Sequence, residues 1–306
     1  MLEPPRIDDF ALELGQGSEI GLALSLATMM FSVALGLKPS SFAFLRSAPR
    51  AFLIGIAGQL FALPILTITL CVLIQPMPSV ALGMILIACC PGGNVSNMLV
   101  LLARGNTALS VSLTATSSLA AAFITPVAVV FWSGLYPPTA ELLSQIEFDA
   151  ISFLLQTSVV LALPLVIGIA VNVYLPRLAA AIRQPLVWLS STTLLVLILL
   201  GGARYWSDFV LIGVSLVGLV ALHNALAFLL GNMLARLGRV SIADRRALTY
   251  EVGIQNAGLG IVILLTQMGG LGGAAVVAGL WGTWHIIAGL ILVMVFRVAD
   301  KLSVRE

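Results

Sequence analysis

The sequence predicts an all-α, polytopic membrane protein, and three properties of the chain lead to this fold class. Of its 306 residues, 60% are hydrophobic and only 9% are charged, and the mean hydropathy is +1.11. Soluble domains are much less apolar. The apolar runs are long enough for single helices that cross a hydrocarbon layer about 30 Å thick, and none alternates strictly as a lipid-facing barrel strand does. We therefore expect a helical bundle in the lipid bilayer.

Nine transmembrane helices are expected, separated by short polar connections. Their approximate ranges are 18–37, 50–74, 79–103, 106–135, 150–175, 185–203, 208–235, 245–268 and 272–297. The first seventeen residues contain four acidic residues and a single arginine, so we interpret 1–17 as a soluble tail rather than a secretory signal, which carries positive charge. Residues 18–299 then form one transmembrane domain, and 300–306 form a cytoplasmic tail.

The basic residues gather on one side of this arrangement. Thirteen of the fifteen Lys and Arg residues fall in the connections after the first, third, fifth and seventh spans or in the C-terminal tail, and only Arg6 and Arg204 lie opposite. Positively charged connections stay in the cytoplasm. We therefore expect a multi-pass protein of the inner (plasma) membrane, with its N-terminus outside and its C-terminus in the cytoplasm. Since topology explains these charges, we expect no nucleic-acid partner.

Two of the expected spans contain residues that a straight helix avoids. The third has Pro91, Gly92 and Gly93 in its middle, and the eighth has Gly253 shortly after Glu251. Either break alone is equally compatible with a proline or glycine kink that neighbouring helices tolerate. Together, the breaks occupy the second-last span of spans 1–4 and again of spans 5–9. Such matched breaks are typical of transporters built from inverted repeats.

Glu251 is the acidic residue that the sequence places inside an apolar segment. A charge at membrane depth costs at least about 3 kcal/mol, so such groups usually face a cavity and carry function. The alternative is a glutamate at a helix end that reaches interfacial water after Arg245 and Arg246. A cation site would use further oxygen ligands, and Ser110 and Thr114 supply hydroxyls at i and i+4 on the fourth span. Hydroxyls are also common at close helix contacts in membranes, which leaves that interpretation open.

Other polar residues within the spans receive simpler interpretations. Gln59, five residues before Pro64, is a further amide near a helix breaker, whereas His223 is interpreted as a packed histidine. Ser118 continues the face of the fourth span. The cysteines Cys71, Cys89 and Cys90 show no metal-ligand spacing and are expected to be small core residues. Five amides away from the breaks are expected to be interhelical hydrogen-bond partners: Gln156, Asn172, Asn224, Asn232 and Gln267.

Three motifs on the broken spans resemble the bile acid:sodium symporter family, and bacterial members in particular. They are Cys-Cys-Pro-Gly-Gly-Asn-Val-Ser-Asn at 89–97, Leu-Ala-Arg-Gly-Asn-Thr-Ala-Leu-Ser-Val-Ser-Leu-Thr at 102–114 and Glu-Val-Gly-Ile-Gln-Asn at 251–256. The resemblance covers essentially the whole chain. It implies a core domain with two crossed, broken helices packed against a panel domain, in a nine-span version that lacks the first helix of one repeat.

The resemblance also implies two sodium ions and a substrate site. The first sodium site maps onto Ser96, Asn97, Ser110, Thr114 and Glu251. The second maps onto Gln59, Glu251, Gln255 and the backbone carbonyls of Val252 and Ile254. Substrate contacts map onto Asn94, Asn256 and His285. The chain departs from the family pattern at Asn94, where many bacterial members have Thr, and at Ile286, where some have Asn.

The function expected is sodium-coupled symport of an organic anion, such as a bile acid or a small metabolite carboxylate, by alternating access. A proton-coupled carrier or antiporter that uses Glu251 as its proton site is the alternative. An enzyme is not expected, because only one acid lies at depth and no serine occupies a nucleophile motif. No obligatory protein partner is inferred.

Overall fold

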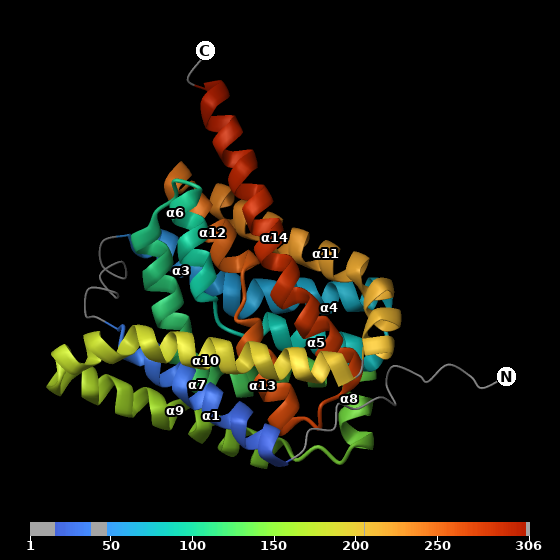
Figure 1. The fold of residues 1–306 in the computed structure, drawn as a ribbon. Coiled ribbons are helices and arrows are strands. Elements are labelled where there is room, and N and C mark those ends of the chain that lie inside the picture. The colour runs from blue at the N-terminus through green and yellow to red at the C-terminus, as the bar shows by residue number, and fades with distance from the viewer. Residues whose placement is uncertain (1–15, 38–47, 205, 304–306) are drawn as a thin grey trace.

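The computed structural model describes residues 16–37, 48–204 and 206–303, and nearly all of this part is helical (Figure 1). The first part contains α1 (Gln16–Ala34), α3 (Pro49–Ala57), η3 (Gly58–Ala62), α4 (Leu63–Ile74), α5 (Pro78–Ala88), α6 (Asn94–Leu102) and α7 (Thr107–Leu135). The second contains α8 (Pro137–Gln145), α9 (Ala150–Tyr174), α10 (Pro176–Arg204), α11 (Trp206–Leu237), α12 (Ile242–Gly253), α13 (Ala257–Gln267) and α14 (Gly272–Ser303). The predicted tail 1–17 lies outside the described residues except for its last two, which begin α1.

The all-helical prediction is confirmed for the described residues. Five continuous helices there are long and apolar enough to cross a membrane, and three shorter apolar helices accompany them. Three details differ from the expected ranges: α8 occupies an expected connection, α10 begins at Pro176 rather than near 185, and α14 continues to Ser303. For α10 and α14, hydropathy marks only the stretch that lies in the hydrocarbon layer, whereas the backbone hydrogen bonds of each helix continue into the polar region beside it.

The helices form two groups. Helices α1, α9 and α10 pack against one another along one side of the molecule, and we call them the panel (Figure 1). Helices α3 to α7 and α11 to α14, which we call the core, pack around the two broken helices. The panel meets the core where α9 packs on α7 and α1 packs on α13.

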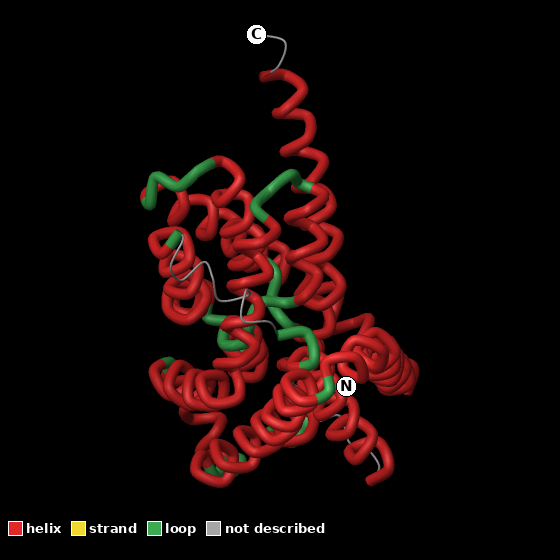
Figure 2. The backbone as a smooth tube through the Cα atoms, turned by 90° about the vertical axis from the view of Figure 1, so that its left-hand side faces the viewer, coloured by secondary structure: helices red, strands yellow, loops and turns green. Residues whose placement is uncertain are grey.

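Both predicted helix breaks are confirmed. The third expected span divides between α5 and α6 at residues 89–93, and the eighth divides between α12 and α13 at residues 254–256. Figure 2 shows non-helical chain in the interior of the helical body. A break at this depth must find partners for its backbone polar groups within the protein, because lipid supplies none.

The two breaks supply those partners to each other. The N–H of Gly93 donates to the carbonyl of Ile254 at 3.2 Å, and the N–H of Asn256 donates to the carbonyl of Pro91 at 2.8 Å. These bonds join segments that lie far apart in the sequence. Each break therefore depends on the other for its stability.

Ion pairs and hydrogen bonds of charged side chains stabilise one end of the core. Arg246, at the start of α12, donates to the carbonyl of Ala103 at 2.7 Å and forms an ion pair with Asp300 of α14. Arg297 of α14 donates to the carbonyl of Leu102 at 2.8 Å. Both carbonyls belong to the end of α6, where positive charge is favourable for the helix dipole. The connection after α6, the start of α12 and the end of α14 therefore meet at one end of the protein.

We expect Arg246→Met to lower the midpoint of thermal unfolding of the purified protein by several degrees. The change removes both donors from the Ala103 carbonyl and the Asp300 carboxylate, while methionine retains most of the apolar stem. Arg236→Met is the matched control, because Arg236 lies exposed in the last turn of α11. Equal midpoints for the two variants in a detergent melting assay would contradict the role assigned to Arg246.

Candidate functional site

Glu251 forms the centre of the site. Its side chain lies near the end of α12 and has 0% of its surface exposed, so the alternative in which it reaches interfacial water is wrong. Its Oε1 accepts hydrogen bonds from the hydroxyls of Ser96, of Ser110 at 2.6 Å and of Thr114 at 3.1 Å. It is the only buried acid among the residues that the structure describes. The predicted first site thus brings its members together around one carboxylate.

Three elements place these hydroxyls. Ser96 lies in the first turn of α6, directly after the break, and Ser110 and Thr114 lie one turn apart on α7. The N-terminus of α7 is fixed by Asn106, whose side chain accepts a hydrogen bond from the N–H of Leu109 at 3.1 Å. The hydroxyls converge on Glu251 because α6 and α7 both pack against α12.

The oxygens of this cluster outnumber the protons that can bridge them. Ser110 Oγ lies 2.6 Å from Glu251 Oε1 and 2.8 Å from Asn97 Oδ1, but its hydroxyl has a single proton for the two acceptors. Thr114 Oγ1 is placed in the same way, 3.1 Å from both carboxylate oxygens and 3.4 Å from Asn97 Oδ1. Lone pairs left without a proton are suited to a hard cation.

Gln59 reaches the opposite side of the carboxylate. Its Nε2 donates to the backbone carbonyl of Glu251 at 2.9 Å and to Oε2 at 3.2 Å. Gln59 belongs to the π-helical turn η3, which precedes Pro64 in one continuous rod. Pro64 has no N–H to donate, and the ladder shifts so that the N–H of Leu63 bonds to the carbonyl of Gly58. The helix breaker noted in the sequence therefore accompanies the turn that carries Gln59.

Gln255 completes the predicted second site. Its Nε2 donates to the carbonyl of Val252 at 2.9 Å and to that of Glu251 at 3.5 Å. The Oε1 atoms of Gln59 and Gln255 are both buried and accept no hydrogen bond from any described residue. Buried acceptors of this kind usually have a partner. The chemistry of these oxygens fits a cation, whereas the carbonyl of Ile254 already accepts a bond from Gly93.

The three predicted substrate residues lie in different surroundings. Asn94 is exposed at the start of α6, while Asn256 is half-buried and its Oδ1 caps α13 by accepting from the N–H of Leu259 at 3.0 Å. His285 is buried on α14, one helical turn before Gly289. A Cβ added at Gly289 would meet the side chains of Leu99 and Ile254. No hydrogen bond joins these three side chains in the described structure. The structure thus places His285 in the buried interior and Asn94 in the lining of a cavity.

A cavity of about 410 Å³ adjoins the carboxylate cluster, between the panel and the core. Asn97 and Thr114 of the predicted first site line it, and Asn94 and Ser118 lie on the same wall. Its other wall consists of residues from α10 and the end of α1. A solute in this cavity therefore lies beside the predicted ion ligands.

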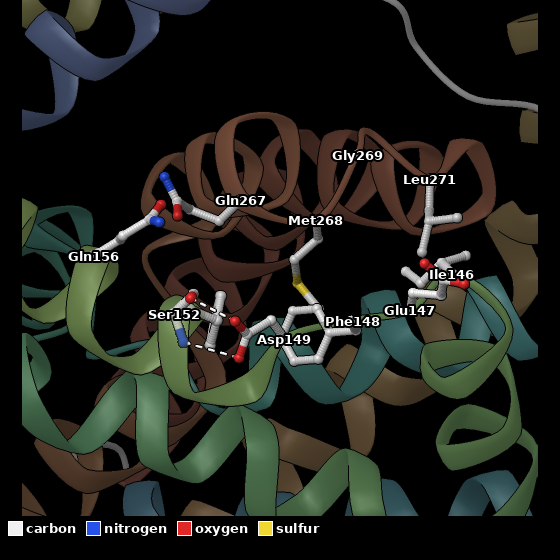
Figure 3. A pocket seen from close by; sticks show the side chains of 11 residues that line it. Ile146, Glu147, Phe148, Asp149, Ser152, Gln156, Gln267, Met268, Gly269 and Leu271 are labelled. Atoms are coloured by element: carbon white, nitrogen blue, oxygen red, sulfur yellow. Dashed lines mark hydrogen bonds between the residues drawn. The ribbon is translucent and has the colours of Figure 1, made fainter.

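A second cavity, of about 460 Å³, lies where the connection before α9 meets the end of α13 (Figure 3). The side chains of Gln156 and Gln267 point toward each other across it. The hydroxyl and backbone N–H of Ser152 donate to Asp149 and hold the pKa of that carboxyl below its ordinary value. None of the predicted site residues lines this cavity, so it is separate from the site around Glu251.

Two residues near the site were not predicted to act there. Gly92 lies against the carboxylate: a Cβ at this position would be 2.9 Å from Glu251 Oε2 and 2.8 Å from Gln59 Nε2. Asn224, expected to be an interhelical partner, donates to the carbonyl of Gly253 at 2.8 Å and so supports the break in the eighth span. The Pro-Gly-Gly sequence signalled the role of Gly92, but no sequence pattern paired Asn224 with Gly253.

The other polar predictions have mixed outcomes. Asn232 forms an interhelical hydrogen bond as expected, Asn172 donates to the carbonyl of Leu37 just after the end of α1, and Gln156 and Gln267 line the second cavity. His223 is fully buried, lies 2.8 Å from Thr67 through its Nε2 and contacts the Trp281 ring edge to face, which confirms that it is packed, whereas its Nδ1 has no hydrogen-bond partner among the described residues.

Two broken helices that meet around a buried carboxylate, within a bundle of membrane-length helices, define a multi-pass membrane transporter. The chain belongs to the Sodium Bile acid symporter family, whose model matches residues 23–206. This finding confirms the family predicted from the three motifs. It also establishes that the protein's relatives are transporters rather than enzymes and that the family depends on sodium.

Relatives from three kingdoms of life support this assignment. The chain is 29% identical over 273 residues to the protein of Bacillus subtilis named uncharacterized sodium-dependent transporter YocS, covering 89% of this chain and 81% of that protein. It is 31% identical over 252 residues to an Arabidopsis thaliana protein named as a probable chloroplastic sodium/metabolite cotransporter, covering 82% and 60%. It is 29% identical over 240 residues to the human ileal sodium/bile acid cotransporter, covering 78% and 67%.

We expect Gly92→Ala to abolish sodium-dependent stabilisation and transport. The added methyl group would press on the Glu251 carboxylate and the Gln59 amide, both of which are held by several bonds. Gly134→Ala is the control, because a Cβ at Gly134 meets nothing within 4 Å. The shift in melting temperature on adding sodium chloride, relative to choline chloride, measures the effect, and an equal shift in both variants would contradict this geometry.

Proposed function

We propose that the protein is a sodium-coupled symporter that carries an organic anion across the membrane by alternating access, with two sodium ions bound at the crossing. The observation that carries the proposal is the wholly buried carboxylate of Glu251, surrounded by hydroxyl and amide oxygens. A carboxylate held away from water is stabilised by a nearby cation. Sodium supplies that charge and is itself the transported ion.

The first sodium site comprises Ser96, Asn97, Ser110, Thr114 and Glu251. Support comes from the shortage of protons between these oxygens, since rotation of each hydroxyl would leave a lone pair for the ion. The second site comprises Gln59, Glu251, Gln255 and the carbonyls of Val252 and Ile254. Its support is the pair of buried glutamine oxygens that accept no bond from the described chain.

Proton coupling through Glu251 is the second candidate, and the burial of a lone acid supports it. A proton on Glu251 would also relieve the shortage of protons in this cluster, but it would leave the oxygens of Gln59 and Gln255 without a partner. A cation satisfies both groups of oxygens. The geometry therefore favours sodium.

The substrate proposed is an amphipathic or small organic anion, such as a bile acid or a metabolite carboxylate. Asn94, Asn256 and His285 are its proposed contacts, and the N–H groups at the starts of α6 and α13 add partial positive charge at the crossing. The names of the Arabidopsis thaliana and human relatives mention metabolite and bile acid cotransport, in agreement with this class.

The proposed topology has nine spans in two inverted repeats, of which one lacks its first helix, with the N-terminus outside and the C-terminus in the cytoplasm. The clustering of Arg104, Arg246 and Arg297 around Asp300 or the end of α6 supports a common side for three of the positively charged segments.

We expect Glu251→Gln to reduce sodium-driven uptake in proteoliposomes to the level of empty liposomes. The amide keeps the size of the side chain but removes the charge that balances the ions. Gln59→Ala should raise the sodium concentration for half-maximal uptake roughly tenfold, as loss of one supporting ligand commonly does. Labelled taurocholate and labelled 4-methyl-2-oxopentanoate serve as substrates. Uptake that survives in Glu251→Gln, or that runs equally well on a pH gradient without sodium, would favour proton coupling.

Cysteine labelling tests the topology. Glu141→Cys and Arg239→Cys introduce thiols at exposed positions, and the native Cys71, Cys89 and Cys90 are buried and should react slowly. We expect a membrane-impermeant maleimide to label position 141 in whole cells and position 239 only in inverted vesicles. Labelling of both positions from the same side would refute the topology.

A further inference from the structure

Among the residues that the structure describes, Arg183 is the only charged one that lines the 410 Å³ cavity between the panel and the core. The sixth expected span begins near 185, which leaves Arg183 in the preceding connection. The structure places it within α10, which begins at Pro176. Its guanidinium therefore belongs to the wall of the cavity that adjoins the site.

The end of α1 leaves space for this side chain. A Cβ added at Gly36 would lie 2.5 Å from Arg183 Nε and 2.6 Å from its Cζ, so only glycine allows the guanidinium to lie so close to α1. Gly36 also lines the cavity, as does Gln184, the neighbour of Arg183 on α10. The position of the charge thus depends on two panel helices.

The charge of Arg183 has no partner within the described chain. Its guanidinium forms no ion pair and donates no hydrogen bond to a described residue, and no acidic side chain from the described ranges lines the cavity. The facing wall offers neutral polar groups, among them Asn94 and Asn97 of α6 and Ser118 of α7. A planar guanidinium with free donors is suited to a carboxylate or a sulfonate.

The apolar part of the lining comes from both walls. It consists of Val33, Leu37 and Val187 on the panel side and Met98, Val111 and Ala115 of the core, with Leu37 just after the end of α1. Such a lining accepts the hydrocarbon part of a ligand while a few polar groups fix its orientation.

We propose that Arg183 binds the anionic group of the transported solute, an organic anion whose apolar part packs between α1, α6, α7 and α10. This inference rests on the proposed function and adds to it a residue of the panel that selects for negative charge. The core then holds the sodium ions and the panel holds the anion, so the solute bridges the two groups of helices.

Arg177 provides a matched comparison. It lies on the same helix, is likewise exposed, and does not line the cavity. If Arg183 served only to keep this connection in the cytoplasm, or only to raise the local surface potential, neutralising either arginine would have the same effect.

The experiment compares Arg183→Gln, Arg183→Lys and Arg177→Gln in proteoliposomes, with labelled taurocholate and labelled 4-methyl-2-oxopentanoate as probes. We expect Arg183→Gln to raise the KM of the transported probe about five- to tenfold, because a charge-assisted hydrogen bond at a partly exposed site is lost. Arg183→Lys should retain part of the affinity, and Arg177→Gln should change KM less than about twofold. Sodium-dependent thermal stabilisation without anion should be unchanged in all three, which shows that they are folded.

The outcomes separate this inference from the proposed function. If the unaltered protein transports a probe and Arg183→Gln has the same KM for it, the role of Arg183 is overturned while the proposed function stands. An equal rise of KM in Arg183→Gln and Arg177→Gln would have the same meaning. Absence of sodium-driven uptake of both probes by the unaltered protein would overturn the proposed substrate class and the role of Arg183 with it.

Discussion

The burial of the Glu251 carboxylate is the constraint on which the rest of the structure depends. A charged carboxylate removed from water loses several kcal/mol of solvation, which only hydrogen bonds or a counter-charge can offset. Three hydroxyls and an amide converge on it, from α6, α7 and η3. Bringing four donors to one point requires close approach of several backbones, and the glycine at position 92 permits it.

The crossing of the two breaks follows from the same constraint. A continuous helix would carry its backbone bonds internally and would present no free carbonyl or N–H near the carboxylate. Broken helices expose such groups, and here each break accepts or donates the bonds that the other requires, as between Asn256 and Pro91. The site can therefore contain polar backbone within an apolar body while the fold remains stable.

The sequence predicted the parts of this arrangement that depend on residue type along one chain segment. Hydropathy located the helices, Pro91 and Gly253 located the breaks, and the i, i+4 spacing placed Ser110 and Thr114 on one face. The parts that it missed depend on contacts between distant segments or on backbone geometry. The start of α10 lies outside the apolar window, and so the position of Arg183 was not predicted. The pairing of Asn224 with Gly253 required the packing of α11 on α12, which no local pattern reveals.

The distribution of site residues between the two groups of helices bears on how coupling can occur. Every proposed sodium ligand, from Gln59 in η3 to Gln255 after α12, belongs to the core, so the ion sites keep their geometry if the core moves as one body. The cavity is different, because its walls come from both groups and its shape changes whenever α1 or α10 shifts against α6 or α7. A solute that contacts both walls therefore responds to the relative position of core and panel, whereas sodium responds to the core alone. Sodium at the first proposed site would then order the start of α6, through Ser96 and Asn97, before the anion reaches its proposed contact Asn94 in the same helical turn. Coupling in this arrangement needs no distant pathway, since ion and solute share one short segment of chain.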